Sequence, residues 1–191
     1  MDERHFISPC DCRLSVYPIE PQMEVTIKNT CYTVGSLLRD ERLAEHFKDG
    51  YLWVFRLSVD DYHRYIYVDN GRESVHRRIP GVLHTVNPVA NDVCPIYKEN
   101  TREYSLLKSE HFGTLLMMEV GALMVGKIEN RPVMSHVRRG QEKGNFAFGG
   151  STIIYMTQKD KVFPDMDILI NSADGIETKV QIGSRIGKGK N

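Results

Sequence analysis

The chain has 191 residues, of which 25 are basic and 25 acidic, so its formal net charge at pH 7 is zero. This balance argues against a nucleic-acid-binding protein, whose affinity for phosphates normally requires a basic excess. Hydrophobic residues make up 41% of the sequence, enough for a packed core. No apolar run approaches the roughly 20 residues of a membrane-spanning helix. The N-terminal residues are charged and polar, without an apolar signal-peptide segment, so we expect a cytoplasmic location.

Short runs that alternate polar and apolar residues dominate the sequence and predict strands. In chain order they cover residues 13–17, 24–27, 51–57 and 81–88, then two or three strands over 103–108 and 114–128 together, then 147–157 and 178–182. One helix is expected at 33–46, with Thr33 or Ser36 as its N-cap. The tail, 183–191, mixes glycine and lysine and is expected to fray. The pattern predicts an α+β, β-rich fold: a single compact domain, residues 1–191, of short, mainly antiparallel strands with one or two helices.

The cysteines do not have the spacing of a metal site. The four are Cys10, Cys12, Cys31 and Cys94, and no CxxC pair or HxxxH motif accompanies them. We therefore expect free thiols and no bound metal.

The segment FAFGGSTIIYM, residues 146–156, places two glycines and two hydroxyl residues inside a run that otherwise resembles a strand. A bulge or a tight bend is the most common reason for such an interruption. The alternative is a peptide bond built to react, because glycine tolerates strained backbone that other residues avoid. The Ser151 hydroxyl would attack the Gly150 carbonyl and shift the acyl group from nitrogen to oxygen. Elimination from that ester would split the chain, and loss of ammonia would convert residue 151 into a pyruvoyl group.

This chemistry needs a base for the serine and a carboxylate that orients the base. Asp11 is one candidate carboxylate, and His63 and His84 are candidate imidazoles. Each also has a plain structural explanation. Asp11 can cap a turn after a proline, the charged residues around His63 can form surface ion pairs, and His84 can be a hydrogen-bonded histidine within a strand. Taken singly, each of these residues favours its structural explanation.

Seven blocks of sequence, taken in order, resemble the catalytic region of the phosphatidylserine decarboxylases, a family of self-cleaving, pyruvoyl-dependent enzymes. The blocks cover residues 8–11, 32–38, 56–64, 80–88, 100–104, 119–122 with 125–128, and 139–152. The last block, a glycine-rich approach to Gly-Ser-Thr, is the most specific of them. The resemblance runs through nearly the whole chain.

The resemblance implies a role for each candidate residue. Ser151 would become the covalent pyruvoyl cofactor, and Gly150 would become the C-terminus of the larger fragment. Asp11 would match the carboxylate of the self-processing relay. His63 would match the histidine that assists decarboxylation or returns the proton. The two fragments, 1–150 and 151–191, would stay associated, and a homodimer is compatible with the resemblance.

One position departs from the family pattern. The family usually carries a second histidine three residues after the first, and here that position is Ile66, which cannot accept a proton. His84 can substitute, or His63 can serve both steps, or self-cleavage is slow or absent. We favour His84. A smaller departure is Cys12, where the family prefers glycine.

The implied activity is that of a carboxy-lyase made as a zymogen, which uses the pyruvoyl group as an electron sink while an α-amino acid loses carbon dioxide. Phosphatidylserine, converted to phosphatidylethanolamine in phospholipid biosynthesis, is the first candidate substrate. A free, soluble amino acid is the alternative, because the chain begins almost at Asp11 and shows no N-terminal amphipathic segment for membrane attachment. We expect no transmembrane segment, and a lipid substrate would make the protein peripheral to the membrane.

Three further classes of protein compete with this interpretation. A non-cleaving, inactive relative that acts as a binding protein is the strongest, because of Ile66. A biotinyl or lipoyl carrier domain shares the glycine-punctuated short strands, but Lys127 lies between glycine and isoleucine rather than between methionines. A serine hydrolase would require a Gly-x-Ser-x-Gly elbow, which the residues around Ser151 do not form.

Overall fold

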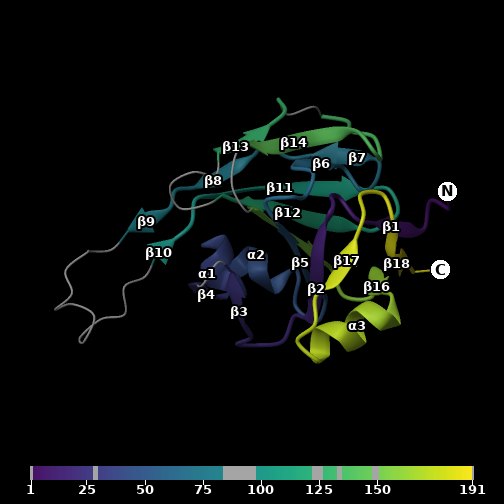
Figure 1. Cartoon of the computed structure of the whole chain (residues 1–191), viewed down its shortest axis with the longest axis horizontal. Helices are drawn as coiled ribbons and strands as arrows, with labels where there is room; N and C mark the ends of the chain where they lie inside the picture. Colours follow the sequence, from purple (N-terminus) through teal and green to yellow (C-terminus); the bar gives the residue numbers. More distant parts are fainter. Residues whose placement is uncertain are drawn as a thin grey trace.

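The computed structural model describes residues 2–27, 30–83, 98–121, 127–132, 135–147 and 151–190. Its centre is an eight-stranded sheet in which every pairing is antiparallel, and this confirms the β-rich α+β class (Figure 1). The strand order is β17 (Thr178–Val180), β2 (Cys12–Pro18), β5 (Tyr51–Leu57), β15 (Ser151–Thr157), β12 (Thr114–Val120), β11 (Arg102–Ser109) and β7 (Gly71–Glu73), and β8 (Arg77–Ile79) also pairs with β11.

Four smaller sheets surround the large one. One contains β13 (Lys127–Asn130), β14 (Glu142–Ala147) and β6 (Arg64–Ile66). Another contains β1 (His5–Ile7), β18 (Arg185–Gly189) and β16 (Val162–Pro164). Two are hairpin pairs, β3 (Glu24–Ile27) with β4 (Thr30–Thr33), and β9 (Val82–Leu83) with β10 (Lys98–Glu99). The β9–β10 pair projects from the body of the molecule (Figure 1).

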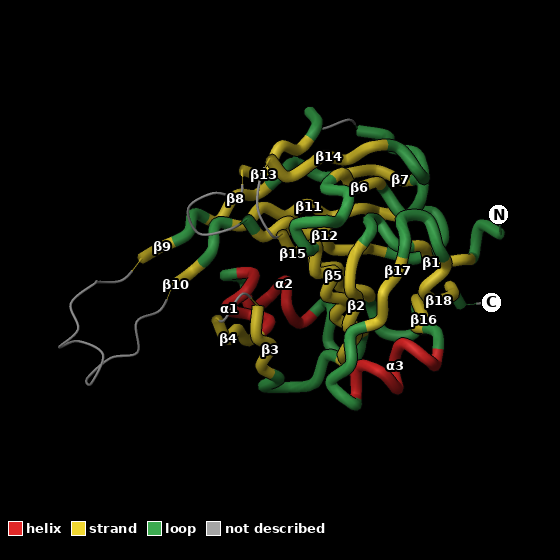
Figure 2. The backbone as a smooth tube through the Cα atoms, in the orientation of Figure 1, coloured by secondary structure: helices red, strands yellow, loops and turns green. Residues whose placement is uncertain are grey.

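Both faces of the large sheet are covered, and β15 shows this most directly because all seven of its residues are buried. Side chains alternate between the faces of a strand. Ile153 and Tyr155 accordingly enter the core that includes Tyr65 and Phe146 from the β13–β14–β6 layer. The intervening residues of β15 enter a second core, which the helices α1 (Val34–Leu38) and α2 (Glu41–Glu45) and the β3–β4 hairpin cover on the other face (Figure 2).

The helix expected at 33–46 is two short helices, so the prediction of a single helix was wrong. Arg39 adopts a left-handed conformation with φ of 50° and ends α1. Asp40 then begins a new helix by accepting a hydrogen bond at Oδ1 from the Leu43 amide, at 3.0 Å. The expected N-cap Thr33 is confirmed, since its hydroxyl accepts from the Ser36 amide. With α3 (Met166–Ala173), which the sequence did not suggest, the described residues contain three helices.

The C-terminal tail does not fray, contrary to the expectation from its composition. Residues Arg185–Gly189 form β18, which lies between β1 and β16. A Cβ on Gly187 would lie 2.7 Å from the Phe163 carbonyl oxygen, and one on Gly189 would lie 3.0 Å from the Phe112 ring. Gly187 and Gly189, which suggested flexibility, are therefore positions where the strand packs too closely for a side chain.

Most of the other predicted strands are confirmed at or near their expected positions, namely β2, β3, β5, β11, β12 and β17. Within 81–88 only β9 falls inside the described residues. The run 147–157 is divided between the last residue of β14 and the whole of β15, and residues 148–150 lie outside the described part. None of the helices in the described residues has the length and apolar composition to span a membrane.

Candidate active site at the start of β15

The register of the large sheet brings the start of β2, the end of β5 and the start of β15 to one end of the sheet. Arg56 on β5 lies opposite Arg13 on β2 and, on its other side, opposite Thr152 on β15. Asp11 precedes β2 and Ser151 opens β15, so both lie at this end with β5 between them. Adjacent strands are about 4.8 Å apart, which separates these two backbones by roughly 10 Å and leaves room for an imidazole between the side chains.

Ser151 is 1% exposed and shares the inner face of β15 with Ile153 and Tyr155. Its backbone pairs with Leu57 of β5, so the first residue of the strand is already part of the sheet. Gly150 lies outside the described residues, as does the rest of the crossing from β14. Because Ser151 is buried and paired within the sheet, its position is fixed for any reaction at the Gly150–Ser151 bond.

His63 lies immediately before β6, in the layer that covers the inner face of the sheet. Its carbonyl accepts a hydrogen bond from the Phe146 amide at 3.1 Å, near the end of β14, from which the chain crosses to Ser151. The imidazole Nε2 lies 3.4 Å from the Val59 carbonyl. Nδ1 is buried and has no hydrogen-bond partner within the described part of the chain. A buried ring nitrogen without a partner is free to exchange a proton with a bound molecule.

Asp11 does not cap its own turn. Its Oδ1 accepts a hydrogen bond at 2.7 Å from the amide of Ile182, a residue far away in sequence. Two backbone hydrogen bonds between Ser8 and the turn at Gly183 and Ser184 hold the same segments together. The carboxylate is thus fixed at the end of the sheet by the C-terminal part of the chain.

Ile66 occupies a place directly beside the segment that carries Asp11. Its amide donates to the Pro9 carbonyl at 3.0 Å, and its half-buried side chain packs against the inner core. A histidine at position 66 would accordingly lie next to residues 8–11. His84, the proposed substitute, lies outside the described residues.

Cys10, next to Asp11, is a poor nucleophile. Cys10 and Cys12 are buried free thiols, and burial raises the pKa of the Cys10 thiol, with its hydrogen bond to Cys12 adding to the effect. A thiol with a raised pKa stays protonated and unreactive. Among the described residues, no three His, Cys, Asp or Glu side chains gather as a set of metal ligands.

A buried charge cluster lies on the same face of the sheet as Ser151. Glu119 on β12 is directly opposite Ile153, which makes it a diagonal neighbour of position 151. Its Oε1 lies 2.8 Å from Nζ of Lys143 on β14, and Lys143 Nζ is 3.7 Å from Oε1 of Glu73. None of these three side chains has exposed surface. The cluster therefore joins the covering layer to the large sheet beside the candidate site.

His76 and Glu103 extend this cluster. The two His76 nitrogens lie 3.1 Å from Glu73 Oε1 and 3.1 Å from Glu103 Oε1. Hydrogen bonds to Glu103 and then to Glu73 raise the pKa of His76 to about 9. The hydrogen bond from His76 in turn lowers the pKa of Glu103 to about 2. At neutral pH both groups are charged.

Tyr155 leaves one polar atom of this region without a partner. Its hydroxyl is buried and makes no hydrogen bond with the described residues. Burial raises the pKa of Tyr155 well above its ordinary value, and the negative charge of Glu119 adds to the shift. The phenol is therefore neutral, and its hydroxyl can donate a hydrogen bond to an acceptor.

The charge cluster was not predicted from the sequence, although the sequence holds one indication of it. Glu119 interrupts an apolar run, Leu115 to Val120, and a carboxylate buried in a strand needs a cation. Lys143 gave no comparable indication, because the residues around it are polar and glycine-rich. Only the packing of β14 over β12 shows that the two are partners.

A model of the family described as phosphatidylserine decarboxylase matches residues 1–188. Among curated proteins, phosphatidylserine decarboxylase proenzyme 2 of Clostridium acetobutylicum is 46% identical over 187 residues, which cover 98% of this chain and 64% of the relative. The phosphatidylserine decarboxylase proenzyme of Clostridium tetani is 42% identical over 185 residues, with 95% and 62% covered. That of Clostridium botulinum, strain Eklund 17B, is 41% identical over 189 residues, with 97% and 64% covered. The chain thus spans a little under two thirds of the length of these relatives.

Proposed function

Because this chain belongs to the phosphatidylserine decarboxylase family, we propose that it is a pyruvoyl-dependent carboxy-lyase that converts phosphatidylserine to phosphatidylethanolamine. The single observation that carries the proposal is the arrangement of Ser151, Asp11 and His63 around one end of the sheet. With such a substrate the protein would work at a membrane surface as a peripheral enzyme.

Self-cleavage at Gly150–Ser151 would produce the cofactor. Ser151 Oγ would bond to the Gly150 carbonyl carbon while the peptide C–N bond breaks, and the hydroxyl proton would pass through a base to the freed amine. Loss of the Cα proton of residue 151 would then expel the Gly150 carboxylate and leave dehydroalanine, and water would hydrolyse its imine tautomer to the pyruvoyl group and ammonia. His84 is the base we favour for the first of these steps, with Asp11 as the carboxylate of the relay. Ser151 fits the product, since the strand pairing that begins at this residue would hold a group at the new chain end.

The pyruvoyl group, once formed, supplies an electron-accepting carbonyl that binds the substrate amine while carbon dioxide leaves. The protein has to orient the substrate and return a proton. His63 is the residue we propose for proton transfer, because its buried Nδ1 has no partner in the described part of the chain. The neutral Tyr155 hydroxyl, on the same face of the sheet, could donate a hydrogen bond that orients the substrate.

The two fragments would remain together after cleavage. Residues 151–190 contribute β15 to the interior of the large sheet, β17 to its edge next to β2, and β18 to the pairing with β1. A bidentate ion pair also crosses between the fragments: Arg56 donates to both oxygens of Glu177, at 2.7 and 2.5 Å. The proposed enzyme is therefore a single folded unit of two chains.

A non-cleaving relative that binds the same ligand is the second candidate function, and Ile66 is the observation that favours it. Mass spectrometry of the purified protein separates the two. The decarboxylase would yield a fragment that begins at residue 151, lacks ammonia and is blocked to Edman degradation, while the Ser151→Ala variant would stay intact. An intact chain after prolonged incubation would overturn the proposed activity and favour the binding protein.

A further inference from the structure

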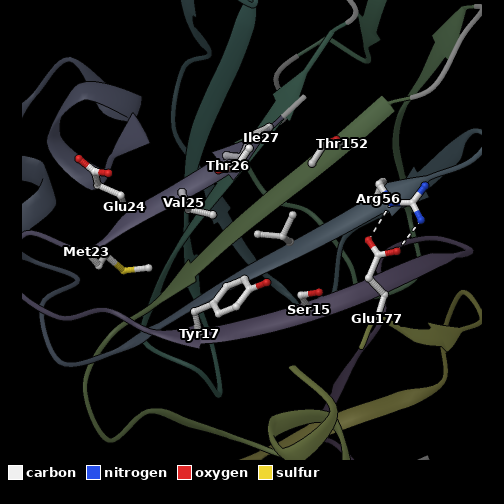
Figure 3. A pocket seen from close by; sticks show the side chains of 11 residues that line it. Ser15, Tyr17, Met23, Glu24, Val25, Thr26, Ile27, Arg56, Thr152 and Glu177 are labelled. Atoms are coloured by element: carbon white, nitrogen blue, oxygen red, sulfur yellow. Dashed lines mark hydrogen bonds and ion pairs between the residues drawn. The ribbon is translucent and has the colours of Figure 1, made fainter. Parts of the chain in front are cut away.

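A pocket of about 340 Å³ lies on the face of the large sheet opposite the Ser151 side chain. Its floor is the outer face of β2, β5 and β15, and β3 forms the facing wall (Figure 3). Nothing in the proposed reaction accounts for it. Its lining residues all lie within the described part of the chain.

One end of the pocket is lined mainly by apolar side chains, and the exposed Glu24, whose Oε2 accepts a hydrogen bond from Cys31 Sγ at 3.3 Å, also lies there. Figure 3 shows Met23 and Tyr17 at this end, away from the Arg56–Glu177 pair. Val25 and Ile27 line the wall on the same face of β3, as the alternation of a strand requires. Val54, in the floor, is only half-buried although β5 is an interior strand of the sheet. An apolar ligand would complete the burial of this surface.

The other end of the pocket is polar but carries no free charge. Arg56 lines it, and Glu177 neutralises the guanidinium through two hydrogen bonds. Burial of the ion pair is partial, with side-chain exposures of 46% and 34%. An anion would have to displace Glu177, so the pocket selects for hydrocarbon rather than for a phosphate.

The polar end also lies beside the candidate active site. Thr152 lines it, and Thr152 is the residue next to Ser151 and opposite Arg56 in the sheet register. Tyr17 pairs with Leu52, four residues along β5 from Arg56. At about 3.3 Å per residue, the pocket therefore runs roughly 13 Å away from the start of β15. A molecule that reacts at residue 151 could place an attached chain along this length.

We propose that this pocket binds one acyl chain of a diacyl lipid whose amino-acid head group reaches residue 151. The inference rests on the proposed function for the head group, but the chain site itself depends only on the shape and the lining of the pocket. It also names the reason for preferring a lipid over a free amino acid, which would leave the pocket empty.

Calorimetry with a series of soluble ligands tests the proposal. The ligands are glycerophosphoserine and the dibutanoyl, dihexanoyl and dioctanoyl phosphatidylserines, each below its micellar concentration, together with free octanoate. The full-length chain carries Ser151→Ala so that no turnover occurs. Affinity should rise with chain length, by up to about fourfold for each methylene that enters the pocket. Octanoate without a head group should bind more weakly than the dioctanoyl lipid, and equal binding would assign the pocket to free fatty acids instead.

Two substitutions in the pocket lining test whether the dependence of affinity on chain length arises in this pocket. Val54→Phe fills the floor and should remove the dependence on chain length. Met23→Ser makes the apolar end of the pocket more polar and should weaken the dependence of affinity on chain length. Met23 is half-buried, so this variant should fold even if Val54→Phe does not. Val75→Phe is the matched control, since Val75 is 78% exposed and lies outside the pocket. Chain-length dependence that persists in folded Val54→Phe and Met23→Ser, or is missing in the parent, would overturn the proposal.

Carbon dioxide release by the Ser151 protein separates this proposal from the proposed function. Chain-dependent binding without decarboxylation would support the acyl site and refute the enzyme. Decarboxylation with the same KM for glycerophosphoserine and for every chain length would support the enzyme and refute the acyl site.

Discussion

Nζ of Lys143 lies 2.8 Å from Oε1 of Glu119, and neither side chain has any exposed surface. The pair joins β14, the strand that leads toward the candidate cleavage site, to β12, the strand beside β15. Burial raises the pKa of Glu119, against the opposing effect of Lys143. An ion pair so deeply buried is costly to break from one side, because it leaves a charge without a partner.

Lys143→Met should lower the free energy of unfolding by about 3–5 kcal/mol, since it leaves Glu119 and Glu73 buried without their cation. The loss should shrink at lower pH, where Glu119 can take up a proton. The double variant Lys143→Met with Glu119→Gln should recover part of the stability. Urea unfolding measures all of these changes.

Lys159→Met is the matched control for that experiment. Lys159 also pairs with a carboxylate, that of Asp49, but at the surface, with side-chain exposures of 61% and 46%. Its loss should cost much less than the loss of Lys143, because solvent screens an exposed ion pair. Equal costs for the two lysine variants would contradict the importance we give to the buried pair.

The stability of the protein should fall as the pH rises through 9. The pKa of His76 is about 9 in the folded protein and 6.5 ordinarily, so folding favours the protonated form. This contribution is fully present below about pH 6.5 and is lost as the pH rises through about 9, with an upper bound of about 3 kcal/mol. The pKa of Glu103 is lowered from 4.5 to about 2, and its contribution is lost as the pH falls through that range.

Unfolding free energies measured across this pH range check both signs. His76→Asn should flatten the alkaline limb, while the acid limb should keep the contributions of other carboxylates. An alkaline limb that is unchanged in His76→Asn would show that another group causes it.

Ile66→His should accelerate self-cleavage. The new imidazole would lie beside the segment of Asp11, because the Ile66 amide binds the Pro9 carbonyl. General-base catalysis typically contributes 10²–10⁴-fold, so a gain of up to about 10²-fold is reasonable for a chain that already cleaves by another route. The appearance of the small fragment on a gel measures the rate. Ile66→Asn adds polarity without a base and should not accelerate it, and a gain in Ile66→Asn equal to that of Ile66→His would rule out the base.

The two candidate histidines should separate the two steps. His63→Ala should leave self-cleavage near its normal rate and reduce carbon dioxide release by roughly 10²–10⁴-fold. His84→Ala should leave the chain largely intact, so the pyruvoyl group would not form and carbon dioxide release would be lost as well. Mass spectrometry follows cleavage, and decarboxylation of a short-chain phosphatidylserine follows the second step. Normal processing in His84→Ala would remove His84 as the substitute base.

Local patterns were sufficient to predict most strands, but not the surroundings of the candidate site. The strands could be predicted because polar and apolar residues alternate along them, as in β2 and β3. Position 40 shows where such patterns fail: Asp40 caps a second helix only because Arg39 turns the chain into a left-handed conformation. The prediction that the tail frays was wrong for a related reason. Its strand needs glycine at 187 and 189 because Phe163 and Phe112, which are distant in sequence, pack closely against these positions.

That Asp11 and Ser151 lie at the same end of the sheet could be anticipated only through family resemblance. Their placement depends on the register of β2 and β15 against β5, and β2 and β15 come from opposite ends of the chain. The carboxylate is also fixed by Ile182, which no local pattern connects to it. Long-range register of this kind is set by the packing of both faces of the sheet, and so it is not encoded in any short segment.

The insertion of β15 between β5 and β12 has a consequence for how the protein can be made. If the bond before Ser151 breaks as proposed, the short chain occupies an interior strand that it could have entered only while it was still joined to the rest. Unfolding of the cleaved protein would release two molecules, and renaturation would become a bimolecular reaction that depends on concentration. Only the uncut chain would then fold efficiently. Cleavage would create the reactive group, but the cleaved protein would no longer refold readily after unfolding.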